Sequence, residues 1–433
     1  MKINIIILLL ILISMVLNIL NYNYFITMLG IVWYFASILI IYATIKYSVK
    51  YKCIQFNIKK IYNALKSKSK NNISPISSLC ISLAAKIGVG SLSGVALAIY
   101  YGGIGTIFWL IIISLLVSIN AFVECILGIK YREKINNIFV GGPSFYIKKC
   151  LNNNILSKLY GLLIIVTYSI LFLSIQANTI VSTGSYFNIN KTYITIILSF
   201  ITLLIILKEL KGISKVNTYL VPIMLLIYFS LGLYVFVINI NIIPNIFLTV
   251  IKEAFNLRSI ISVFLIGMQR AIFITESSIG TSAISSSTCD NDSKKQGMLE
   301  VFGIYITIFI VCFTTFLIIV TSNYNQISFS HINGIEIVIY AFKYHFGVSG
   351  GTILSIITIL FAFSTIISSY FFGESNLLLF SRNKIINTIF KIVFILVIII
   401  SSYIKSNILW NLTDYFVAIL AIINVYAILK INK

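Results

Sequence analysis

The sequence predicts an all-α polytopic membrane protein, built from two inverted five-helix repeats and one additional N-terminal helix. Three observations lead to this prediction. The 433 residues are 59% hydrophobic and have a mean hydropathy of +1.03. Apolar runs of about 20 residues, the length that crosses a bilayer as a helix, recur along the chain. Basic residues alternate between abundant and scarce from one connecting segment to the next.

The composition excludes several classes of protein. Only 10% of the residues are charged, against about 25% in an ordinary soluble domain. The net charge of +21 lies in short loops and not on one basic face, so we expect no nucleic-acid partner. With two histidines in the whole chain, no catalytic triad or histidine cluster can be assembled, and we do not expect an enzyme. Rings of charged residues typical of a channel are also missing from the sequence.

Eleven segments have the length and apolar character of membrane spans. They are residues 24–48, 76–101, 104–130, 157–184, 192–210, 218–240, 260–285, 297–322, 350–376, 387–404 and 409–430. Residues 4–20 form a further apolar run, which is either a signal-like segment or a twelfth span. Because no A-x-A-type cleavage site follows it, we favour a retained helix.

The basic residues predict the orientation of these spans. If the loop after residues 24–48 is cytoplasmic, the inside segments carry 24 lysines and arginines and the outside segments carry 5. A wrong number of spans would scramble this alternation. We therefore expect a multi-pass protein of the cell (inner or plasma) membrane, embedded in the lipid bilayer, with a cytoplasmic C-terminus.

The spans fall into two sets of five. Residues 1–75 would hold the hydrophobic N-terminal segment, the extra transmembrane helix and a basic cytoplasmic loop. Residues 76–240 would form the first five-helix repeat and residues 241–430 the second. The first helix of each set is interrupted, and the sets start on opposite sides of the membrane. Such paired broken helices in inverted repeats are typical of secondary transporters with a binding site at the midplane.

The first interruption reads GVGSLSGVA (88–96). Irregular backbone is tolerated in a membrane only where protein or a water-filled cavity satisfies it. If Gly88, Gly90 and Gly94 unwind the helix, the amides of Val89, Gly90 and Ser91 would face an anion such as a carboxylate. The freed carbonyls near Ala84 and Ile87 would suit a small cation. Alternatively, the glycines form a small-residue packing face.

Three charged residues lie at membrane depth, where a charge costs about 2.5–3.5 kcal/mol on the insertion scale. Lys86 lies in the first interruption and Glu276 in the second, so we expect them to pair. Arg270 either takes part in function or reaches an outer mouth with its charged end.

Polar groups at three further positions are candidate site residues. Glu124 lies at the cytoplasmic end of the span 104–130, beside Lys130 and Arg132, where we expect a gate or loop clamp. Ser364 and Thr365 either bond back to their own helix or bind sodium.

Eight blocks, in order, resemble the alanine or glycine:cation symporter family over roughly residues 24–430. They are GVGSLSGVA (88–96), GGIGTIFW (102–109), ECILGIKYRE (124–133), GGPSFYI (141–147), RAIFITESSIGTSA (270–283), QG (296–297), FAFSTIISSYFFGE (361–374) and WNLTDYF (410–416).

This resemblance implies a LeuT-type fold and import of small neutral amino acids, coupled to sodium or less often to protons, by alternating access. It implies no organic cofactor, with a sodium ion as the one bound metal. The substrate would lie between the broken helices, at Gly88, Val89, Gly90, Ser91, Phe273, Thr275, Glu276, Ser277 and Gly280. Sodium would be held by Ala84, Ile87, Ser364 and Thr365, and coupling or gating would involve Lys86, Glu124 and Arg270.

The departures from the family pattern cluster at the expected site. Val89 replaces a threonine, Ser91 an asparagine and Ser369 a tryptophan. An aspartate in the seventh core helix becomes Thr307, and both sides of Glu276 are altered. Lys86 stands where a small or hydroxyl residue is usual. Its ammonium would either substitute for a bound sodium ion or bind an anionic part of the substrate. A divergent paralogue with a changed substrate, or a transporter-like amino-acid sensor, is the alternative function.

Overall fold

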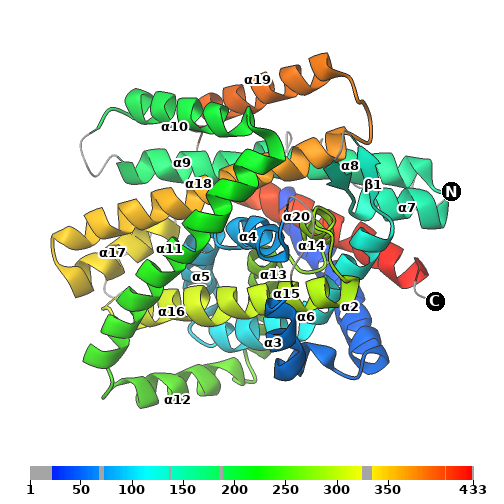
Figure 1. Ribbon diagram of the computed structural model, residues 1–433. Helices are drawn as coiled ribbons and strands as arrows, with labels where there is room; N and C mark the ends of the chain where they lie inside the picture. The colour runs from blue at the N-terminus through cyan, green and yellow to red at the C-terminus, as the bar shows by residue number, and fades with distance from the viewer. Residues whose placement is uncertain are drawn as a thin grey trace.

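The computed structural model describes residues 22–67, 73–135, 138–184, 189–323, 334–404 and 406–431 (Figure 1). This part of the chain is almost entirely helical and has one two-stranded sheet. The apolar run 4–20 lies outside the described residues, so its assignment stays a prediction.

Nine helices in the described residues are long and apolar enough to cross a membrane. Each coincides with a predicted span. The other two predicted spans are shorter apolar helices, α10 (Lys191–Ile206) and α13 (Ile260–Thr275). The nine are Met28–Lys50, Pro75–Gly102, Thr106–Lys130, Asn154–Gly184, Glu209–Ile238, Ser293–Val320, Ser349–Leu377, Lys384–Ser401 and Ile408–Ile431.

The elements before the first predicted repeat are α2 (Tyr22–Lys50), η1 (Ile54–Phe56) and α3 (Ile58–Leu65). In the first predicted repeat they are α4 (Pro75–Lys86), α5 (Val89–Gly102), α6 (Thr106–Lys130), β1 (Glu133–Ile135), β2 (Ile138–Val140), α7 (Pro143–Leu151), α8 (Asn154–Val166), η2 (Thr167–Phe172), α9 (Leu173–Gly184), α10 and α11 (Glu209–Ile238).

The second predicted repeat contains α12 (Ile243–Ala254), α13, α14 (Thr281–Ser286), α15 (Ser293–Ile306), η4 (Thr307–Cys312), α16 (Phe313–Val320), α17 (Gly334–Phe346), α18 (Ser349–Leu377), α19 (Lys384–Ser401) and α20 (Ser406–Ile431). The segments η2 and η4 are π-helical turns within two long helices, a distortion that is frequent at functional sites.

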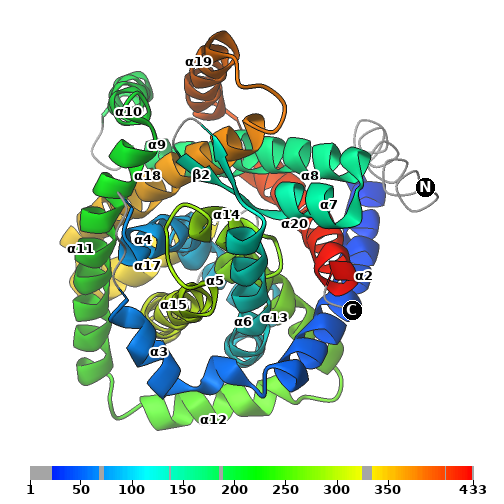
Figure 2. The same ribbon diagram turned by 45° about the vertical axis from the view of Figure 1, so that its right-hand side comes forward.

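The interrupted helices lie in the middle of the molecule. Figure 2 shows α4, α5, α6, α13, α14 and α15 inside a ring that includes α2, α11, α12, α18 and α20. α13 packs against α5, α14 packs against α4, and both contact α6. The most apolar 18-residue stretch of Pro75–Gly102 is wholly buried inside the molecule. In Glu209–Ile238, only 28% of the corresponding stretch is buried. Hydrophobic side chains on the outer helices are exposed because lipid is their natural surrounding.

The additional helix α2 is not a detached anchor. It packs against both α20 and α6, and the hydroxyl of Tyr47 donates a buried hydrogen bond of 2.8 Å to the carbonyl of Ile428. The first and last described helices are therefore joined, as Figure 1 also shows.

Candidate functional site

The first interruption is short and centres on Gly88. α4 ends at Lys86, α5 begins at Val89, and Gly88 between them has extended backbone angles (φ −94°, ψ −164°). The amide of Val89 donates to Oε1 of Gln176 at 3.0 Å, and Oγ of Ser91 donates to the carbonyl of Gly88 at 2.8 Å. The predicted break is thus present, but Gln176 on α9, which supplies its acceptor, was missed by the sequence analysis.

Gly90 and Gly94 do not unwind the helix, contrary to the prediction. Both are helical residues of α5, and a Cβ atom on Gly90 would come within 2.8 Å of the Phe273 ring. These two glycines allow close packing of α5 on α13, which is the alternative that the sequence left open. Only Gly88 belongs to the break itself.

The predicted sodium residues come together in part. Oγ1 of Thr365 on α18 donates to the carbonyl of Ala84 at 2.7 Å, directly beside the first break. It also bonds to its own helix at the carbonyl of Phe361, at 3.0 Å. Oγ of Ser364 donates to the same Phe361 carbonyl at 2.8 Å. The back-bonding of both hydroxyls to their own helix is therefore present, and sodium binding by these two residues stays a prediction.

The second interruption is longer and more contorted. α13 ends at Thr275, and α14 begins at Thr281. Between them Glu276, Ser278 and Gly280 have positive φ angles of 51°, 75° and 105°. Glycine is needed at 280 because only it adopts such a conformation freely. The predicted break in the second set is therefore present.

Glu276 is buried in this break without a cation. Its Oε2 accepts a hydrogen bond from Thr281 at 2.8 Å, and its Oε1 has no partner among the described residues. The neighbouring hydroxyls are turned away: Thr275 donates to its own helix, and Ser277 donates to the carbonyl of Val117 at 2.8 Å. Of the polar side chains predicted here, Glu276 alone keeps a free buried acceptor.

The predicted ion pair between Lys86 and Glu276 is wrong. Nζ of Lys86 lies 2.6 Å from Oε2 of Glu300 on α15, a buried pair. It also donates to Oγ of Ser82 at 2.6 Å and to Oγ of Ser282 at 3.3 Å. Glu300 was missed because it lies only one turn inside the predicted span 297–322, where a charge is unremarkable. One sequence signal could have suggested it: Glu300 is an acidic residue near the start of a predicted span. Ser82 and Lys86, which it binds, are four residues apart and so share one face of α4.

Arg270 is a core residue and does not reach an outer mouth. It is 8% exposed and forms an ion pair with Asp414 on α20. Nε2 of Gln269 donates to the same carboxylate oxygen at 3.0 Å. The pair ties α13, which leads into the second break, to the last described helix.

Glu124 does not contact the basic loop that follows α6. Its carboxylate is fully buried, and Oε1 accepts a hydrogen bond from Nδ2 of Asn424 at 2.7 Å. Arg132, one of its predicted neighbours, instead binds Asp290 at 3.0 Å. The expected loop clamp at Glu124 is therefore wrong in its partners, and its role in gating stays a prediction.

Aromatic rings close one side of the space between the interruptions. Phe273 stacks on Phe172 with ring centroids 5.1 Å apart and lies 5.4 Å from the ring of Trp410. The first of these partners comes from the π-helical turn η2. Phe273 therefore lies between the first break and two rings that the sequence analysis did not identify.

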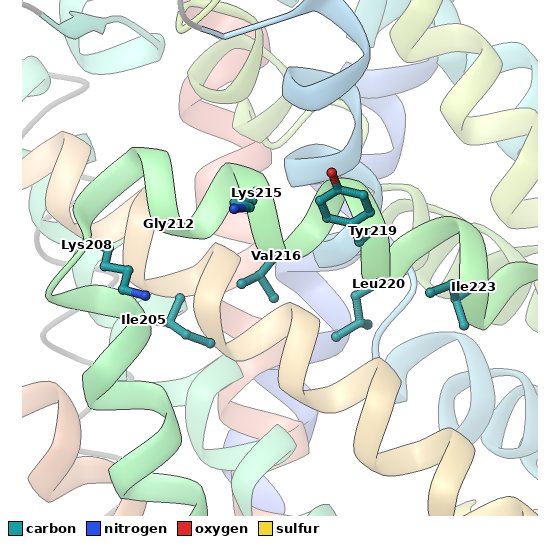
Figure 3. Close-up of a pocket in the computed structure, with 8 residues that line it drawn as sticks. All are labelled: Ile205, Lys208, Gly212, Lys215, Val216, Tyr219, Leu220 and Ile223. Carbon is teal, nitrogen blue, oxygen red and sulfur yellow. The ribbon is translucent and has the colours of Figure 1, made fainter.

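The groove drawn in Figure 3 lies elsewhere. Its volume is about 510 Å³, and Figure 3 shows it along α11, at the side chains of Lys208, Lys215 and Tyr219. None of the predicted site residues lines it. The residues of the two interruptions are themselves buried in this conformation.

This arrangement defines a polytopic membrane protein whose core is a pair of interrupted helices carrying buried charges, which is typical of secondary transporters. The sequence model of the sodium:alanine symporter family matches residues 17–433, and the chain belongs to this family. The family and the relatives found for the chain are transporters and not enzymes.

Three relatives illustrate the range of the family. The amino-acid carrier protein AlsT of Bacillus subtilis (strain 168) is 29% identical over 93% of this chain and 88% of its own. The probable sodium/glutamine symporter GlnT of the same organism is 30% identical over 85% of this chain and 78% of its own. The sodium/alanine symporter AgcS of Methanococcus maripaludis is 26% identical over 84% and 83%.

Proposed function

We propose that this protein is a secondary active transporter of the cell membrane that imports small neutral amino acids together with sodium. Alternating access around the two interruptions, in a LeuT-type arrangement of two inverted repeats, would move both. The observation that carries the proposal is the packing of two broken helices against each other at the centre of the molecule. Membership of the sodium:alanine symporter family supports the same conclusion.

The proposed substrate site would bind both charged groups of a zwitterionic amino acid, its carboxylate and its ammonium group. The N-terminus of α5 presents backbone amides and the positive end of a helix dipole, which suit a carboxylate. The free Oε1 of Glu276 suits an ammonium group. Phe273 fills the space over Gly90, so little room is left for a substrate side chain. The proposed preference for alanine- or glycine-like substrates rests on that lack of room.

The proposed sodium site joins α4 to α18. The carbonyl of Ala84 and the hydroxyl of Thr365 already lie 2.7 Å apart, and oxygen atoms of this kind suit a hard cation. Ile87 and Ser364 would complete the set. The ion would replace the hydrogen bond between Thr365 and Ala84, so sodium binding would stabilise the packing of α18 on the first break.

A sodium-independent mode is the second candidate, and one observation favours it. The ammonium of Lys86 has three oxygen partners, from α4, α14 and α15, much as a bound cation would. In this mode the Lys86 side chain substitutes for a coupling ion. The departures of Val89, Ser91 and Ser277 from the family pattern also leave a changed substrate or a sensor as an alternative.

Uptake into proteoliposomes distinguishes these functions. Labelled alanine, glycine, serine and glutamine are tested with a sodium gradient, with a proton gradient and with neither. We expect sodium-driven accumulation of at least one small amino acid. Accumulation that ignores sodium would favour the Lys86 mode, and binding without uptake would favour the sensor.

The variant Thr365→Val tests the proposed sodium site. Loss of one oxygen should raise the sodium concentration for half-maximal uptake on the order of tenfold, comparable to a lost hydrogen bond to a charged group. Thr358→Val is the matched control, because Thr358 is equally buried on α18 but its hydroxyl has no partner among the described residues. Equal sodium dependence of the two variants would exclude Thr365 as a ligand.

A further inference from the structure

The buried charges of the core do not balance. Both buried cations among the described residues, Lys86 and Arg270, are already paired, with Glu300 and Asp414. Three buried carboxylates among the described residues have no ion pair: Glu124, Glu276 and Glu374. Glu374 accepts hydrogen bonds from Tyr370 (2.8 Å) and Asn387 (3.1 Å). Glu276 belongs to the proposed substrate site, whereas Glu124 belongs to neither the proposed substrate site nor the proposed sodium site.

Glu124 is the least compensated of these groups outside the proposed substrate site. It is 0% exposed; Asn424 donates a hydrogen bond of 2.7 Å to its Oε1, and the backbone amide of Ser278 also faces the carboxylate. Its Oε2 has no partner there. An ionised carboxylate in such a place is strongly disfavoured, because neither water nor a cation stabilises the charge. The neutral, protonated acid is the form that this environment accepts.

The titratable groups around Glu124 supply no alternative compensation. Lys86 is the nearby cation, but its ammonium is held 2.6 Å from Glu300. The surrounding phenols and thiol are committed to other atoms: Tyr47 to Ile428, Tyr146 to Asn424, Tyr160 to Ile279 and Cys125 to Ser286. Apart from the backbone amide of Ser278 and the side chain of Asn424, these groups are therefore a neutralised ion pair and donors already in use.

A second unsatisfied acceptor lies one helical turn away. Asn120 precedes Glu124 by four residues on α6, so their side chains share a face. Nδ2 of Asn120 donates to Thr44 and to Ser278, both at 2.9 Å, which fixes the amide orientation. Its Oδ1 is buried without a partner among the described residues. One proton on Oε2 of Glu124 would supply the donor that both orphaned oxygens require.

We propose that Glu124 is a proton-binding site, whose proton bridges its Oε2 to Oδ1 of Asn120. Two orphaned oxygens fit a proton better than a metal ion, which takes four or more ligands. Hydrogen bonds connect this site to the second interruption through Ser278. Asn120 donates to the hydroxyl of Ser278, and Asn424, which holds Glu124, donates to the Ser278 carbonyl at 2.8 Å. Release of the proton would charge this cluster and disrupt the contacts that hold the break.

Infrared spectroscopy of the purified protein tests the proton without any transport. The difference spectrum of wild type minus Glu124→Gln at neutral pH should show the carbonyl band of a protonated carboxylic acid, shifted in D₂O. Glu133→Gln is the matched control: Glu133 is partly exposed and lies 3.5 Å from Lys149, so this variant should lose a carboxylate band instead. A carboxylate band in the Glu124 difference spectrum would overturn the proposal.

A second variant covers the case in which Glu124→Gln does not fold. Asn120→Ala removes the proposed acceptor and keeps the acid, so the same carbonyl band should remain but change frequency. An unchanged band would exclude the bridge to Asn120. Glutamine at 124 can itself donate to Asn120 and accept from Asn424, so we expect that variant to fold.

The consequence for transport rests on the proposed function. Because the bound proton stabilises the cluster, wild-type uptake should be full at low pH and fall as pH rises through proton release, by up to tenfold per pH unit. Glu124→Gln should transport without that decline. The same decline in both proteins would overturn the link to transport. If the wild type transports no amino acid at any pH, the proposed function fails, while the infrared result still decides the proton site.

Discussion

At the scale of single residues, the ammonium of Lys86 is buried and has oxygen partners on three elements of the fold. Its partners Ser82, Ser282 and Glu300 come from three elements, and Ser82 itself donates to Glu300 at 2.6 Å. Such an enclosure offsets the cost of removing the two charges from water only while every member is present. Truncating one side should therefore cost far more than truncating both.

The variants Lys86→Met and Glu300→Met test this. Each leaves the opposite charge buried and unpaired, so each should lower the free energy of unfolding by about 3–5 kcal/mol. The double variant removes both charges and should recover most of that loss. Thermal unfolding of the purified protein in detergent completes the double-mutant cycle. If the two single losses simply add in the double variant, the pair contributes no coupling.

The sequence placed Lys86, Arg270 and Glu276 at membrane depth, but it gave the wrong partner for Lys86 and none for Arg270. A charge at membrane depth is visible in the hydropathy pattern, because the cost of burial makes it an exception. The partner depends on how distant helices pack, and both Glu300 and Asp414 come from other elements. Similarly, the roles of Gln176 and Asn424 appear only once α9 and α20 are in place.

At the scale of elements, the three glycines of the first interruption have different roles. A Cβ atom on Gly88 would lie 2.5 Å from Oγ1 of Thr365 and 3.1 Å from Nε2 of Gln176. On Gly94 it would meet Ile274 at 3.8 Å, an ordinary contact. From the sequence alone the three positions are equivalent, because the repeated glycine does not show which one leaves the helix.

The variants Gly88→Ala and Gly94→Ala should therefore differ sharply. Alanine at 88 must displace Thr365 from Ala84, so we expect a loss of about 1–3 kcal/mol in stability and weaker sodium dependence of uptake. Alanine at 94 should be tolerated, since it favours the helix by about 0.5–1 kcal/mol over glycine. Melting temperature and sodium titration of uptake measure the two effects. Equal behaviour of the two variants would mean that Gly88 is not the hinge of the break.

At the scale of the whole molecule, span length was the most informative signal. It located the nine helices of the described residues that are long and apolar enough to cross a membrane, because a helix in lipid must be both. Its other two predicted spans correspond to the shorter apolar helices α10 and α13. It missed α7, α12 and α17, which have 9, 12 and 13 residues and fall below that length. They pack against longer helices, α7 on α8, α12 on α6 and α17 on α5 and α18, and only this tertiary packing reveals them.

The orientation of the chain follows from the positive-inside alternation and can be tested by labelling. Cys53 is exposed in the connection between α2 and α3, which is predicted to be cytoplasmic. Leu257, 91% exposed between α12 and α13, lies on the predicted outer side. In a Cys150→Ser background, a membrane-impermeant maleimide should label Cys53 in inside-out vesicles and not in right-side-out vesicles. With Cys53→Ser added, Leu257→Cys should show the opposite pattern. Because the remaining cysteines are buried, labelling of both positions from one side would overturn the predicted topology, and with it the inverted relation of the two repeats.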